Sequence, residues 1–63
     1  MDNATRQLCR DEAIRSLESY QRTGLAGFLQ KGLDRARALG IDYALCGNVP
    51  ALILRLQIGD EQS

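Results

Sequence analysis

Few side chains in this sequence could take part in chemistry. The chain has no histidine and only two cysteines, so the usual acid–base and Cys–His forms of catalysis lack their central group. Cys9 and Cys46 lie far apart, without the close spacing of metal ligands. Asp11 and Glu12 are adjacent, so on a helix their carboxylates point in different directions. We therefore expect a protein that is not an enzyme and has no catalytic residues, no cofactor and no metal site.

The charges of the chain balance. Eight basic and eight acidic residues give a formal net charge of zero, so no long-range field draws the whole molecule toward nucleic acid or an anionic membrane. No apolar stretch approaches the roughly 20 residues that cross a bilayer, and the charged beginning of the sequence does not resemble a secretory signal. We therefore expect a cytoplasmic protein whose two cysteines are free thiols.

The strongest structural pattern lies in residues 25–39. Apolar side chains recur there every three or four residues, which places them on one stripe of a helix. The stripe consists of Leu25, Phe28, Leu29, Leu33, Ala36 and Leu39. Gly24 and Gly40 flank the segment and can end helices. A weaker stripe, supported by acid-first charge pairs one turn apart, predicts an earlier helix over residues 3–23. The two predicted helices would form a helical hairpin.

Gly32 falls within the apolar stripe of the second predicted helix. A glycine there costs about 1 kcal/mol relative to alanine. It also offers no packing surface of its own, so it indicates the close approach of another backbone. Two interpretations stay open. Gly32 marks a crossing point at a dimer or partner interface, or it is a local imperfection that the fold tolerates.

Residues 41–46 and 51–58 change to a two-residue period. Apolar side chains alternate with other residues along both segments, and a turn-like Gly-Asn-Val-Pro sequence separates them. This pattern predicts a β-hairpin after the helical hairpin. The expected fold class is therefore α+β, in a single small domain over residues 1–63 with a polar tail at 59–63.

The alternative for the last segment is a third helix. Asn48 would cap it, Pro50 would occupy its first turn and Gly59 would stop it. Such a helix would be apolar nearly all round, which a chain this small can bury only in an oligomer. The alternative fold is thus an all-α three-helix dimer.

In the strand interpretation, one face of residues 51–58 belongs to the core and the other to a surface. The core face consists of Leu52, Leu54, Leu56 and Ile58, and the surface carries Ile53, Arg55 and Gln57. A lone hairpin leaves its edges open. Pairing the edge of residues 51–58 with the same strand of a second chain would close it, so we expect a homodimer.

These features predict a small regulator or inhibitor that acts by protein–protein interaction, of the kind common among phage and plasmid regulators. The partner is a protein whose identity the sequence does not give, and the expected partner-binding residues are Gly32, Ile53, Arg55 and Gln57.

The alternative function is a DNA-binding transcriptional regulator of helix-turn-helix type. Two helices joined by a tight glycine turn have the outline of that unit. Its contacts to nucleic acid would come from the second predicted helix, through Lys31, Arg35 and Arg37. The zero net charge of the chain disfavours this interpretation, because neutralisation of the phosphate backbone dominates such binding.

Overall fold

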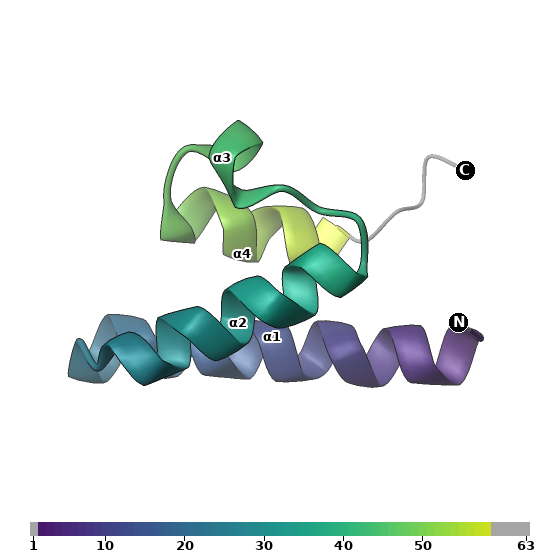
Figure 1. Ribbon diagram of the computed structural model, residues 1–63, viewed down its shortest axis with the longest axis horizontal. Coiled ribbons are helices and arrows are strands. Elements are labelled where there is room, and N and C mark those ends of the chain that lie inside the picture. The colour runs from purple at the N-terminus through teal and green to yellow at the C-terminus, as the bar shows by residue number, and fades with distance from the viewer. Residues whose placement is uncertain (1, 59–63) are drawn as a thin grey trace.

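Four helices make up the part of the chain that the computed structural model describes, residues 2–58. They are α1 (Asn3–Thr23), α2 (Ala26–Ala38), α3 (Tyr43–Cys46) and α4 (Val49–Ile58) (Figure 1). Helices account for 84% of the described residues, and no strand occurs among them. The expected α+β fold, with a β-hairpin over 41–46 and 51–58, is therefore wrong. The fold is all-helical, as in the alternative, with one additional short helix.

The first two helices form the predicted hairpin. The Asp2 carboxylate accepts a hydrogen bond from the Thr5 N–H at 2.8 Å and caps the start of α1. Gly24 ends α1 in the left-handed conformation, with φ of 77°, and its N–H donates to the Tyr20 carbonyl oxygen at 2.7 Å. The helices expected over 3–23 and 25–39 are thus confirmed, the second being one residue shorter at each end.

Capping groups explain why the last segment is helical. The Asn48 side-chain oxygen accepts a hydrogen bond from the Ala51 N–H at 2.8 Å. Pro50 lies in the first turn of α4, where its missing N–H costs little. A helix satisfies its backbone groups within one chain, whereas an isolated hairpin leaves strand edges open. These local bonds therefore outweigh the alternating pattern of the sequence.

The burial pattern of α4 follows helical spacing. Leu52 and Leu56, one turn apart, are fully buried, and Ile53 is 8% exposed. Leu54 and Ile58 are 57% and 55% exposed. The expected core face of Leu52, Leu54, Leu56 and Ile58 is thus wrong for two of its members, and Ile53 lies in the core instead of on the surface. The reason is that each residue advances about 100° around a helix and not the 180° of a strand.

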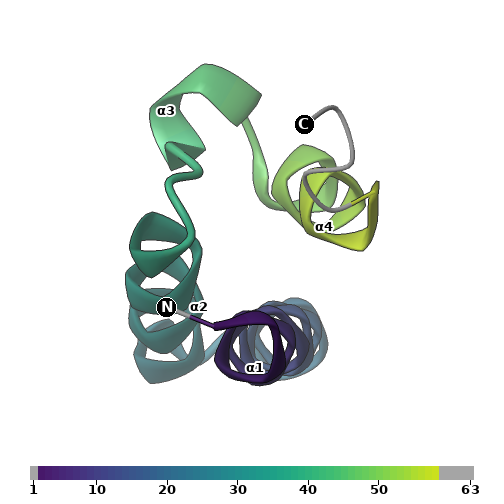
Figure 2. The same ribbon diagram turned by 90° about the vertical axis from the view of Figure 1, so that its right-hand side faces the viewer.

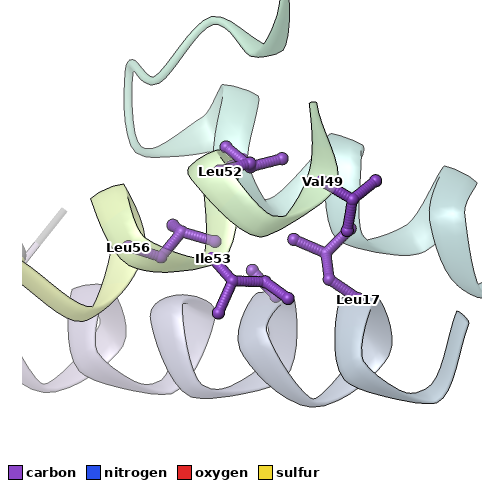
Figure 3. Close-up of a cluster of buried hydrophobic side chains, with 7 residues drawn as sticks. Leu17, Val49, Leu52, Ile53 and Leu56 are labelled. Carbon is purple, nitrogen blue, oxygen red and sulfur yellow. The ribbon is translucent and has the colours of Figure 1, made fainter. Parts of the chain in front are cut away.

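One apolar cluster joins α1, α2 and α4. Its buried members are Ala13, Leu17, Ala36, Val49, Leu52, Ile53 and Leu56. Figure 3 shows Ile53 on the side of α4 that faces α1, with Leu17 of α1 pointing toward α4. Viewed end-on, α2 and α4 lie along two sides of α1, and α3 spans the space between α2 and α4 (Figure 2). The core is therefore made where α4 packs on α1, with Ala36 contributed by α2.

Candidate protein-interaction surface

Gly32 is buried where α2 packs on α1. A Cβ atom added to it would come within 2.6 Å of both Cγ and Cδ2 of Leu17, and within 3.4 Å of the Ala13 carbonyl oxygen. The close approach indicated by the sequence is therefore present, and the neighbouring helix belongs to the same chain.

The other three residues expected to bind a partner lie on α4. Ile53 is buried in the core, whereas Arg55 and Gln57 are exposed. Residues two apart on a helix face different directions, so these two polar side chains do not share a face. The structure therefore does not gather Gly32, Ile53, Arg55 and Gln57 into one surface, and only the two polar residues are placed to meet another molecule.

The cations of the DNA-binding alternative lie along α2. The Arg35 Nε donates a hydrogen bond to Glu12 Oε1 of α1 at 2.8 Å. This bond raises the pKa of Arg35 still further above the neutral range, with a smaller contribution from the Glu12 charge. Lys31 and Arg37 are exposed, but Arg37 stands two residues from Arg35 and so faces another direction. The three cations do not form one continuous basic face.

Helix α3 presents a large apolar side chain to solvent. The Asp42 carboxylate accepts a hydrogen bond from the Ala44 N–H at 3.0 Å and caps the helix. Gly47 ends it with φ of 95°, a value that L-amino acids rarely adopt. Leu45 lies between these two fixed ends and is 87% exposed. Because both ends are held, the Leu45 side chain projects from a defined backbone.

Two hollows flank α3 and meet at the segment 40–42. The larger, of about 560 Å³, lies toward α2, and its walls include Leu33, Arg37 and Tyr43. The smaller, of about 310 Å³, lies toward α4, and its walls include Leu45 and residues of the first two turns of α4. Leu45 together with these two hollows is called the α3 surface below. It combines apolar walls with an arginine in each hollow, Arg37 in the larger and Arg55 in the smaller.

A second apolar feature lies on the outer side of α4. Leu54 and Ile58 are one helical turn apart, and both are more than half exposed. This pair is called the α4 ridge below. The sequence contained a signal for it, because a helical wheel of residues 49–58 leaves both side chains outside the stripe formed by the buried residues. The exposure of Leu45 has no comparable signal, since it depends on where α3 lies in three dimensions.

The chain offers no relative from which a site could be transferred. Protein-family models, curated proteins and solved structures were compared with it, and none matches. Within residues 2–58, no three His, Cys, Asp or Glu side chains gather in a way that could hold a metal ion. None of the helices in that part of the chain has the length and apolar character to cross a membrane.

Proposed function

We propose that this protein is a non-enzymatic regulator or inhibitor that binds another protein through the α3 surface. The observation that carries the proposal is the 87% exposure of Leu45 at the wall of the smaller hollow. Burying an exposed leucine is worth about 1.5–3 kcal/mol. A partner that covers Leu45 would gain free energy of this size on binding.

The shape of the surface supports a protein partner. Interfaces depend on a few residues that become buried in well-packed pockets of the other molecule. Leu45 can act as such an anchor, and the hollows beside it can receive side chains from the partner. Arginine is enriched at interfaces, and Arg37 and Arg55 line the two hollows. The α3 surface therefore offers a partner one projecting side chain, Leu45, and two hollows.

The DNA-binding alternative has less support. Arg35 already donates a hydrogen bond to Glu12. The three cations Lys31, Arg35 and Arg37 do not all lie on one face of α2. The net charge of the chain is zero. Both Cys9 and Cys46 are free, which suits the cytoplasm, where thiols stay reduced. The proposal thus places a protein-binding regulator in that compartment.

The test is affinity capture from lysate of the source cell with three tagged chains. Leu45→Asp should lower the amount of captured partner about 10- to 100-fold, the equivalent of one buried leucine. The matched control is Leu8→Asp, because Leu8 is also exposed, at 64%, but lies on α1. It should capture as much partner as the wild type.

Nuclease treatment and salt separate the two candidate functions. A captured protein that resists nuclease and depends on Leu45 supports the proposal. Co-purifying nucleic acid that disappears with salt, and that is unaffected by Leu45→Asp, would instead favour DNA binding. Circular dichroism of each variant checks that the helices are intact.

A further inference from the structure

The larger hollow of the α3 surface differs from the α4 ridge, because two charged side chains stand among its apolar walls. Leu33, Ile41 and Tyr43 give it apolar and aromatic surface. Arg37 and Asp42 give it one positive and one negative charge. Small-molecule sites in proteins are hollows of about 300–1,000 Å³ with mostly apolar walls and a few polar groups that orient the ligand. The hollow, of about 560 Å³, has this size and this make-up.

Local hydrogen bonds hold the backbone that carries the two charges. At the end of α2, the Gly40 N–H donates to the Arg37 carbonyl oxygen at 2.9 Å. The next N–H, that of Ile41, donates to the Ala36 carbonyl oxygen at 3.0 Å. This is a Schellman ending, which requires a left-handed residue, and Gly40 has φ of 82°. Asp42 comes two residues later and is held by its capping bond to α3, so both charged side chains start from defined positions around one turn.

The two charges do not neutralise each other. Within residues 2–58, no carboxylate lies within 4.0 Å of a nitrogen of the Arg37 side chain, although Asp42 lines the same hollow. The Asp42 carboxylate uses Oδ1 to accept the Ala44 N–H, which leaves Oδ2 for a donor from another molecule. A ligand can therefore pair with both charges without first breaking an ion pair of the protein.

We propose that this hollow binds a free amino acid with a large apolar side chain, such as leucine or phenylalanine. The ligand carboxylate pairs with Arg37, because a guanidinium matches a carboxylate with two parallel hydrogen bonds. The ligand ammonium donates to Asp42, and the ligand side chain contacts the apolar walls. One charge of each sign in the hollow complements a zwitterion and not a simple anion or cation. Both protein charges are exposed and screened by solvent, so the dissociation constant is on the order of 1 mM.

NMR titration of the full, isotope-labelled chain tests the proposal with L-leucine and L-phenylalanine as probes. The backbone amide signals of Gly40, Ile41 and Ala44 should shift and saturate. Three analogues each lack one of the recognised groups. Glycine has no side chain, N-acetyl-L-leucine has no ammonium and L-leucinamide has no carboxylate. The last two should each bind about 10-fold more weakly than leucine, the effect of losing one hydrogen-bonded charge, and glycine should bind more weakly than leucine as well.

Variants assign the two charges. Arg37→Gln and Asp42→Asn should each raise the dissociation constant for L-leucine about 10-fold. Asparagine also caps helices, so Asp42→Asn removes the charge and keeps the start of α3. The matched control is Lys31→Gln, which removes an exposed cation of α2 outside the hollow. It should bind leucine like the wild type.

Three outcomes would overturn the proposal. The first is the absence of saturable shifts with both amino acids, and the second is equal binding of leucine and its two blocked analogues. The third is unchanged binding in Arg37→Gln and Asp42→Asn. Leu45 is not a wall of the larger hollow, so Leu45→Asp should still bind leucine. This proposal and the proposed function can therefore fail independently.

Discussion

At the scale of single residues, the contact between Gly32 and Leu17 sets the distance between α1 and α2. Leu17 is fully buried, and it is the branched Cγ as well as a terminal methyl group that approaches Gly32. A side chain held in this way cannot move aside without disturbing the rest of the core, because protein interiors are close-packed. Gly32 therefore weakens α2 as a helix but allows α1 and α2 to pack closely.

We expect Gly32→Ala to destabilise the protein. Overpacking costs about 1–3 kcal/mol, which exceeds the gain of about 1 kcal/mol from replacing a helical glycine by alanine. The control is Gly27→Ala in the same helix, where an added Cβ meets no atom within 4 Å. That substitution should stabilise the protein by about 0.5–1 kcal/mol. Urea unfolding followed by circular dichroism measures both, and a stabilising Gly32→Ala would contradict the close contact.

At the scale of elements, α4 places two neighbouring residues in different environments, with Ile53 buried and Leu54 exposed. Ile53→Asp would place an unpaired charge in the core, which costs several kcal/mol, and a chain of this size has only about 3–5 kcal/mol to lose. We therefore expect Ile53→Asp to unfold the chain. Leu54→Asp changes an exposed position and should leave the helical signal in circular dichroism intact.

The strand interpretation of residues 51–58 gave the opposite order for these two substitutions, so their comparison is a direct test of the secondary structure. Retained helicity in Ile53→Asp together with unfolding of Leu54→Asp would contradict the helix. Unfolding of both variants would mean that α4 is buried on every side even in the monomer.

The sequence was sufficient for α1 and α2 because their apolar residues fit only the helical period and Gly24 marks the turn between them. It was insufficient for residues 41–58. The leucines at 52, 54 and 56 alternate as in a strand, while Val49, Leu52, Ile53 and Leu56 also fit a helix. In so short an apolar run, capping by Asn48 and closure of the backbone within one chain decide between the two.

Less of the candidate site could be predicted than of the fold. Arg55 and Gln57 were correctly expected at the surface. Ile53 was expected at the surface, because a strand would have turned it away from Leu52. In the helix it lies in the core. Leu45 was not singled out, since exposure of an apolar residue depends on which elements pack over it.

At the scale of the whole molecule, stability rests on the contact between α4 and the helical hairpin. Two of the three largest fully buried side chains, Leu52 and Leu56, come from α4, and the third, Leu17, comes from α1. The hairpin alone keeps only Ala13, Leu17 and Ala36 of the buried cluster. The helices are therefore expected to unfold as one cooperative unit.

Leu52→Ala tests this cooperativity. Removing a buried leucine side chain costs about 2–5 kcal/mol, comparable with the whole stability of so small a core. We expect loss of most helical signal, including that of α1 and α2, and loss of amide protection in α1 by hydrogen exchange. Leu54→Ala at the exposed position is the control and should change little. A protected α1 in Leu52→Ala would mean that the hairpin is stable without α4.

The sequence order of these contacts also bears on how fast the protein folds. Helices α1 and α2 are consecutive and joined by a tight turn, and α3 and α4 are consecutive as well. The packing of α4 on α1 joins elements that are not consecutive in the chain. Chains dominated by local contacts fold on the microsecond-to-millisecond timescale. Fast folding of this kind would shorten the time in which the core leucines of an unfolded copy could meet those of another.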